Sequence, residues 1–83
     1  MIIHLVEPKL SDEYDDWDYD HFTIIDSTRI KDYDRFLKFI KQFKDKMMPI
    51  EYKGHWYMLL EYVFVFPEDS DHLPVIRLYV TKY

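Results

Sequence analysis

The sequence predicts an α+β fold, a single small domain in which an antiparallel sheet of about five strands carries one amphipathic helix on one face. Three observations lead to this prediction. Residues 31–47 have apolar side chains at helical spacing, whereas the segments before and after them are short, apolar and rich in β-branched and aromatic residues. The glycine at position 54 marks a tight turn. The expected order of elements is β-β-α-β-β-β, with neither repeats nor a linker.

The predicted helix is the clearest element of the chain. Its apolar residues recur three and four positions apart and form one face: Tyr33, Phe36, Leu37, Ile40, Phe43 and Met47. Acidic residues in its first turn and lysines in its last turn suit the helix dipole. We expect Asp32 to be the N-cap, with Ser27 or Thr28 as the alternative if the helix begins earlier.

Strand-like segments flank this helix: residues 2–6, 21–26, 50–57, 56–66 and 73–83. Residues 50–57 predict a hairpin that turns at Lys53-Gly54, because glycine readily adopts a positive φ. Residues 56–66 are apolar on both faces, which is typical of a central strand. In the last segment Ile76, Leu78 and Val80 form one apolar face.

This order of elements also gives a provisional topology. If the helix crosses the sheet once, the connection 7–20 and the loop 67–72 lie at the same end of the sheet. The first or the fifth strand is then expected to leave an open edge, which is consistent with a homodimer.

Length and composition restrict the class of protein. The 83 residues make one domain, residues 1–83, whose core depends on large side chains, since 19% of the residues are aromatic. The chain has no cysteine, which excludes a disulfide framework and a thiolate zinc site. The first residues lack the pattern of a signal peptide, and no apolar run approaches the length of a membrane span. We therefore expect a cytoplasmic protein.

Negative charge is concentrated in two segments that contain neither Lys nor Arg. Residues 12–20, DEYDDWDYD, hold six acids and three aromatics, and residues 67–72 hold three more acids. The candidate site acids are Asp12, Glu13, Asp15, Asp16, Asp18 and Asp20 in the first segment, and Glu68, Asp69 and Asp71 in the second. The net charge is −5, so the rest of the chain is positive and the molecule is expected to be dipolar.

The first acidic segment resembles a phosphate backbone in its spacing. On a strand, Asp16, Asp18 and Asp20 would share one face at intervals of about 6.6 Å, close to the phosphate spacing along one DNA strand. The same alternation continues into Phe22 and Ile24, which are expected in the core. The segment therefore requires a twist or a bulge.

Metal binding and catalysis find little support. Three of the aspartates have the spacing of an EF-hand loop, but His21 and Ser27 stand where that loop needs Gly and Glu. The four histidines are scattered singly, and the chain has neither a nucleophile motif nor a glycine-rich phosphate loop. We expect no metal, no cofactor and no enzymatic activity. Glu61 interrupts an apolar strand, and we expect it to form a cross-strand ion pair with Arg77. The alternative is that Glu61 faces a pocket or an acidic rim.

The function that these features favour is inhibition by binding another protein. The acids would supply a field that mimics DNA and attracts a basic surface, and Trp17 and Tyr19 would act as aromatic anchors. The expected partner is a basic protein surface, such as that of a nuclease or a nucleic-acid-binding complex. The alternative for the aromatic residues is that they fold inward and cap the sheet.

No residue motif identifies a family. The general character of the chain (small, acidic, rich in aromatics, free of cysteine and of enzyme motifs) resembles phage- and archaeal-virus-encoded inhibitors, including anti-CRISPR and anti-restriction proteins, and also nuclease-immunity proteins. The resemblance implies a protein that acts in the cytoplasm of a host cell by blocking a nucleic-acid-binding surface.

Two alternatives remain at this point. The first is an immunity protein or antitoxin that neutralises a nuclease. The second is a nucleic-acid-binding protein that uses the basic outer face of the helix, formed by Arg35, Lys38, Lys41 and Lys46. Direct nucleic-acid binding is disfavoured at the acidic segments, because phosphate requires Lys and Arg.

Overall fold

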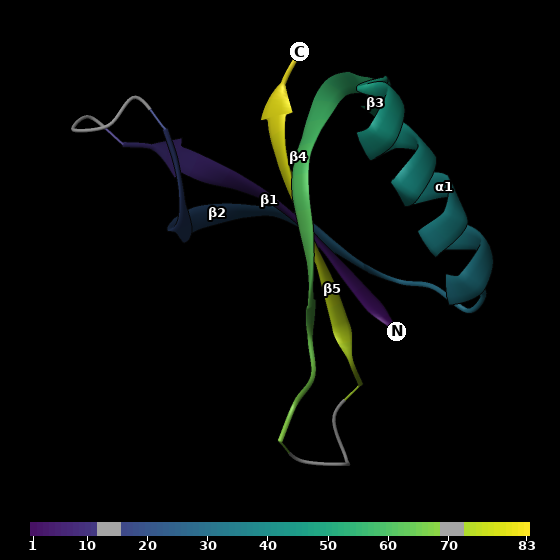
Figure 1. Cartoon of the computed structure of the whole chain (residues 1–83). Helices are drawn as coiled ribbons and strands as arrows, with labels where there is room; N and C mark the ends of the chain where they lie inside the picture. The colour runs from purple at the N-terminus through teal and green to yellow at the C-terminus, as the bar shows by residue number, and fades with distance from the viewer. Residues whose placement is uncertain (12–15, 69–72) are drawn as a thin grey trace.

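The computed structural model of the chain describes residues 1–11, 16–68 and 73–83. These residues form the strands β1 (Ile2–Leu10), β2 (Trp17–Arg29), β3 (Pro49–Tyr52), β4 (His55–Val65) and β5 (Val75–Lys82), and the helix α1 (Tyr33–Lys46) (Figure 1). The predicted α+β class and the order of elements are confirmed. β1 and β2 are both longer than expected, because they continue outward as a two-stranded arm.

The strands lie in the order β2-β1-β5-β4-β3, and the central pair is parallel. β1 runs parallel to β5 from Ile2 beside Val75 to Val6 beside Tyr79, whereas the other neighbouring pairs are antiparallel. The expected antiparallel sheet is thus mixed. A parallel pair needs a long connection, and here that connection contains all the other elements, so no local pattern indicates it.

The parallel pair determines where the two acidic segments go. Because β4 is antiparallel to β5, it also runs opposite to β1. The last residue of β1, Leu10, and the last residue of β4, Val65, therefore lie at opposite ends of the sheet, as Figure 1 shows. The expectation that residues 7–20 and 67–72 share one end is wrong.

Helix α1 packs on one face of the sheet. The carboxylate of Asp32 accepts a hydrogen bond from the backbone N–H of Arg35 at 3.2 Å, which confirms Asp32 as the N-cap. The helix ends at Met47, whose φ of 52° is left-handed. The main core between helix and sheet consists of Ile3, Ile40, Tyr57, Leu59, Ile76, Leu78 and Val80.

The β3–β4 hairpin turns where the sequence predicts. Lys53 and Gly54 both have positive φ, 49° and 81°, as a two-residue turn between antiparallel strands requires. β3 is short and pairs with residues 55–58 of β4, so no described strand covers the same edge of residues 59–65. β4, which the sequence predicts to be central, is therefore an edge over most of its length. The sequence predicts an open edge at the first or the fifth strand, but β1 and β5 are both central.

The sheet curls until its two margins meet. β2 and β3 are the outermost strands, yet the hydroxyl of Tyr52 on β3 donates a hydrogen bond to the carboxylate of Asp26 on β2. The ammonium of Lys53 lies 2.9 Å from the same carboxylate. We call these three residues the margin latch, because they join strands that the sheet order places farthest apart.

The core is expected to respond to truncation according to burial. Ile76 is fully buried, and Ile76→Ala should lower the free energy of unfolding by about 2–5 kcal/mol. Ile76→Val should cost about 0.5–1.5 kcal/mol, which keeps the comparison measurable if the alanine variant does not fold. Ile24 is 55% exposed, so Ile24→Ala should change stability by no more than about 0.5 kcal/mol. Urea unfolding followed by circular dichroism checks this, and equal losses at the two positions would contradict the burial described.

Candidate functional site

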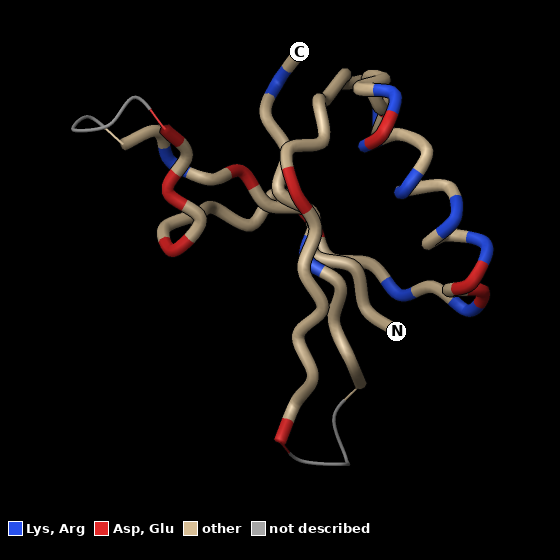
Figure 2. The backbone as a smooth tube through the Cα atoms, in the orientation of Figure 1, with Lys and Arg blue, Asp and Glu red and all other residues tan. Residues whose placement is uncertain are grey.

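The β1–β2 arm carries the acidic residues away from the core. Its described charged residues are Glu7, Lys9, Asp16, Asp18 and Asp20, and His21 lies beside them. Figure 2 shows acidic positions gathered on this arm and basic positions gathered along α1, on the other side of the sheet. The dipolar distribution expected from the sequence is therefore also a spatial one.

The acidic strand is interrupted, as the sequence predicts, but only part of the reason holds: Phe22 is half-buried, whereas Ile24, expected in the core, is 55% exposed. Lys9 pairs with Asp18 and the adjacent Pro8 pairs with Phe22, so residues 19–21 are extra on β2. The predicted bulge is confirmed. Because residues 19–21 are extra, Asp16, Asp18 and Asp20 do not continue as a regular strand, and the even phosphate-like spacing is lost. What remains is a local cluster of carboxylates.

Local hydrogen bonds fix two of these carboxylates. Asp18 Oδ2 lies 2.7 Å from Nδ1 of His21, and Asp18 Oδ1 accepts the backbone N–H of Asp20 at 3.0 Å. The hydrogen bond with His21, followed by the backbone bonds, lowers the pKa of Asp18. Asp16 accepts the backbone N–H of Trp17 at 2.8 Å. These hydrogen bonds hold both carboxylates in place.

The aromatic side chains of the arm lie in two different environments. Tyr19 packs edge-on against Tyr79, with ring centroids 4.8 Å apart, and Phe22 packs against the same ring at 5.9 Å. Burial raises the pKa of Tyr19. Tyr19 thus caps the sheet face opposite α1. Trp17 is half-buried and lines a surface groove of about 670 Å³ together with Pro8 and Leu10. Both expected anchors keep surface that a partner could contact, since Tyr19 is 37% exposed although its ring packs on Tyr79.

Arg77 belongs to the aromatic cluster on the outer face rather than to an ion pair. Its guanidinium lies 4.5 Å from the ring centroid of Phe22, and Nη1 donates to the hydroxyl of Tyr79 at 3.1 Å. The register places Arg77 beside Val63 and Glu61 beside Tyr79. The expected Glu61–Arg77 pair is therefore wrong, because a register shift after Leu59 moves Glu61 along the strand.

Glu61 pairs with the helix instead. Nζ of Lys44 lies 2.5 Å from Oε1 of Glu61 and 5.4 Å from the ring centroid of Tyr62. This hydrogen bond lowers the pKa of Glu61 and raises that of Lys44. The pair joins the last turn of α1 to the uncovered part of β4. The sequence could not predict it, because the two residues are 17 positions apart on different elements.

Glu68, the described acid of the second segment, is not part of the same surface. Glu68 follows β4 at the end of the sheet opposite to the arm, so it does not join Asp16–Asp20. Five predicted site residues lie outside the described residues: Asp12, Glu13, Asp15, Asp69 and Asp71. The described site is therefore the arm alone, with Asp16, Trp17, Asp18, Tyr19 and Asp20.

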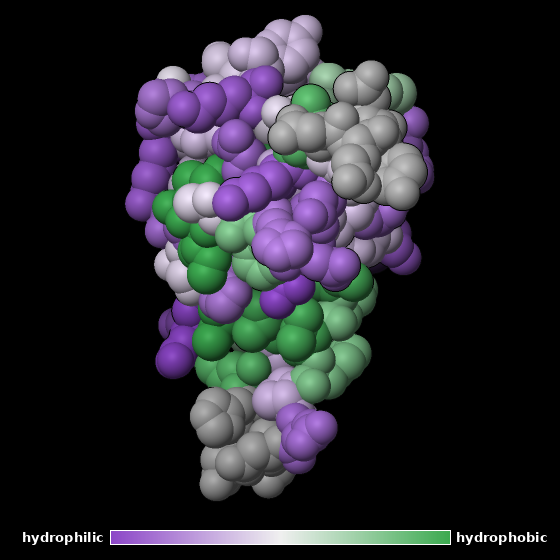
Figure 3. Space-filling view, turned by 90° about the vertical axis from the view of Figure 1, so that its left-hand side faces the viewer, coloured by the Kyte–Doolittle hydropathy of each residue, from purple (hydrophilic) through white to green (hydrophobic). Residues whose placement is uncertain are grey.

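The uncovered end of β4 forms an apolar surface. Val63, Phe64, Val65 and Phe66 are all exposed, and the rings of Phe64 and Phe66 stack with centroids 6.2 Å apart. Figure 3 shows apolar residues gathered in the lower part of that view, where β4 ends and β5 begins. Contiguous exposed apolar surface of this kind marks interaction sites.

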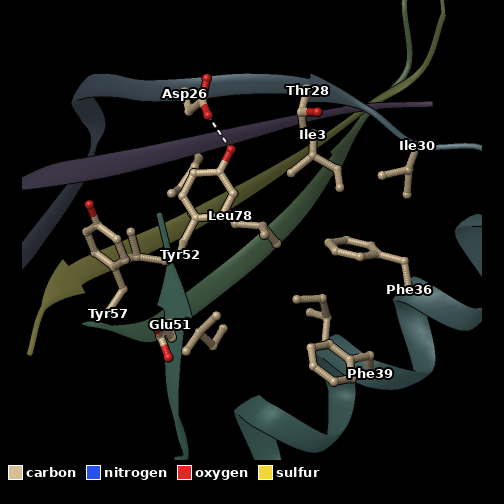
Figure 4. A pocket seen from close by; sticks show the side chains of 14 residues that line it. Ile3, Asp26, Thr28, Ile30, Phe36, Phe39, Glu51, Tyr52, Tyr57 and Leu78 are labelled. Atoms are coloured by element: carbon tan, nitrogen blue, oxygen red, sulfur yellow. Dashed lines mark hydrogen bonds between the residues drawn. The ribbon is translucent and has the colours of Figure 1, made fainter. Parts of the chain in front are cut away.

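An apolar pocket of about 280 Å³ lies between α1 and the curled face of the sheet. In Figure 4, Phe36 points from the helix toward Ile3 and Leu78, and the Asp26–Tyr52 hydrogen bond lies at the opposite end. From the sequence, the apolar residues that line the pocket are predicted to be ordinary core residues. Nothing in their spacing distinguishes a pocket from a filled core.

Two further properties of the described residues bear on function. They contain no group of three or more His, Cys, Asp or Glu side chains able to hold a metal ion. No helix in the part of the chain that the structure describes has the length and apolar character that a membrane crossing requires.

Comparison with known proteins gives no relative for this fold and site: no family model, no curated protein and no solved structure matches the chain. The functional argument therefore depends on the chain's own residues.

The margin latch is expected to make stability depend on pH at low salt. The hydrogen bond from Tyr52, with those from Lys53 and the backbone, lowers the pKa of Asp26 from 3.8 to about 2. A lowered pKa stabilises the fold at pH values above 3.8, and this contribution disappears as the pH falls toward about 2. In thermal unfolding, wild type should be more stable than Asp26→Asn at pH 6, and the two midpoints should converge toward pH 2.

The comparison has an internal control, because the two proteins differ in no carboxylate other than that of Asp26. A difference in midpoint that stays constant from pH 6 to pH 2 would show that the Asp26 carboxylate contributes nothing through its charge.

Proposed function

We propose that this protein binds a basic surface of another protein through the β1–β2 arm and thereby blocks that surface. The observation that carries the proposal is the position of Asp16, Asp18 and Asp20 on an arm that extends from the core beside the half-buried Trp17. Clustered carboxylates steer a basic partner, and an aromatic side chain at their margin supplies apolar contact. The surface to be blocked is one that binds nucleic acid, since such surfaces are rich in Lys and Arg.

The structure supports a narrower form of this idea than the sequence suggests. The cluster is compact and irregular rather than evenly spaced, so the proposal is charge complementarity and not a replica of a DNA strand. An immunity protein that neutralises a nuclease would use this same charge complementarity, with the nuclease as the basic partner. The proposal assigns the protein no catalytic role.

A second copy of the chain is a further proposed partner, at a different surface. Residues 59–65 of β4 have one unpaired edge among the described residues, and Val63–Phe66 are uncharged and exposed. An antiparallel β4–β4 pair about a two-fold axis would extend both sheets and cover these side chains.

The arm is tested by charge reversal. The triple variant Asp16→Lys/Asp18→Lys/Asp20→Lys should lose the ability to displace fluorescent duplex DNA from a panel of basic nucleic-acid-binding proteins. We expect at least a tenfold rise in the concentration needed for displacement, and a weaker salt dependence. The matched control reverses three charges on the helix, Arg35→Glu/Lys38→Glu/Lys41→Glu, and should displace DNA like wild type.

Two results would count against the arm. Displacement that persists unchanged in the arm variant would contradict the proposal, as would a wild-type protein that displaces DNA from no member of the panel. A mobility shift of free DNA at low salt that disappears in the helix variant would instead identify the runner-up, nucleic-acid binding by the basic face of α1.

Self-association is tested at the β4 edge. Val65→Lys places a charge in the uncovered strand and should weaken dimerisation at least tenfold, measured by analytical ultracentrifugation over a concentration series. Ile24→Lys makes the same type of change at an exposed aliphatic residue of β2, the opposite margin, and should leave dimerisation unchanged. A wild-type chain that stays monomeric over the whole series would reject this interface.

A further inference from the structure

We propose that the apolar pocket between α1 and the curled sheet binds a neutral, aromatic small molecule about the size of two fused rings. This inference is independent of the proposed function, because the pocket and the arm are formed by different side chains.

The walls of the pocket are formed by side chains of the sheet and of helix α1. Ile3 and Leu5 of β1 and Leu78 and Val80 of β5 supply the sheet side, and Phe36, Phe39 and Ile40 supply the helix side. The lining is almost entirely carbon, and most of these residues are buried or half-buried. Cavities of this kind hold water poorly and accept apolar molecules readily.

The polar groups at the margin of the pocket select against charge. Among its described lining residues, Asp26 and Glu51 carry carboxylates. These carboxylates repel an anionic ligand such as a fatty acid. Lys53 already pairs with Asp26 at 2.9 Å, so this carboxylate is not free to bind a cation. The hydroxyl of Thr28 remains as a neutral hydrogen-bonding group. A neutral ligand is therefore the best match.

Size and shape indicate a flat aromatic molecule. The volume of about 280 Å³ is close to twice that of an engineered cavity of about 150 Å³ that binds benzene. Four rings line the space, those of Phe36, Phe39, Tyr52 and Tyr57, and can pack edge to face against an aromatic guest. Two fused rings meet both conditions.

The test uses indole as the probe and the full chain with ¹³C-labelled Ile, Leu and Val methyl groups. In NMR titration we expect saturable shifts at the methyl groups of Ile3, Ile40 and Leu78, with little change at the exposed Val63 and Val65. Indole should also raise the thermal unfolding midpoint. Indole-2-carboxylate, an anionic relative, should bind at least tenfold more weakly.

Variants that fill the pocket with a larger side chain test whether indole binds there, and a variant with the same new ring elsewhere is their matched control. Leu78→Phe and Leu5→Phe add volume from two different strands, and each should weaken indole binding at least tenfold. Ile24→Phe also places a phenyl ring on an aliphatic position, but on an exposed part of β2, and should bind like wild type.

Three outcomes would overturn the inference: no methyl shift up to the solubility limit of indole, shifts confined to the exposed end of β4, or undiminished binding in the filled variants. If one filled variant does not fold, the other variant and the wild-type shift map still decide. None of these outcomes bears on partner binding by the arm.

Discussion

The parallel pairing of β1 with β5 is the constraint on which the rest of the structure depends. It joins the first strand of the chain to the last, and it places the most buried strand, β5, in the middle of the sheet. Since β4 is antiparallel to β5 and so runs opposite to β1, the described acids of the arm and Glu68 lie at opposite ends of the sheet. The same pairing leaves the margins to β2, to the short β3 and to the uncovered part of β4. Both candidate interaction surfaces, the acidic arm and the apolar β4 edge, follow from this one ladder.

The curl of the sheet is the second consequence of its architecture. Strands twist, and the twist accumulates across a sheet, so that a five-stranded sheet with a helix on one face becomes concave on that face. In this protein the curl is sufficient for Asp26 and Tyr52 to bond across the full order of strands. The helix spans the concave side without filling it, and Phe36 and Phe39 border the space that remains. The latch and the pocket are therefore two results of one curvature: the margins meet, and the hollow between them is lined with core residues.

Much of the fold could be predicted from the sequence, because local signals determine it. The spacing of apolar residues and the N-cap Asp32 identify the helix, and Lys53-Gly54 identifies the turn. The alternation of acidic and apolar residues predicts the bulge found at residues 19–21, but it wrongly places Ile24 in the core, since this side chain is 55% exposed. The parallel pair, the Lys44–Glu61 bond and the margin latch could not be predicted, since each joins residues distant in sequence. Of the candidate site, the acids were recognisable from composition, but their grouping with Glu68 depended on a topology that local patterns do not encode.

Charge alone would not hold a long-lived complex at the arm. At about 0.15 M salt the screening length is about 8 Å, and exposed carboxylates contribute more to the rate of encounter than to the lifetime of a complex. A durable contact requires apolar side chains that become buried beside the acids. Tyr19 packs on Tyr79 but is still 37% exposed, so it can add to such a contact. Leu10 is 55% exposed and is paired in register with Trp17. These two residues are therefore the apolar centre that a partner must cover, and the aspartates around them set which partners arrive.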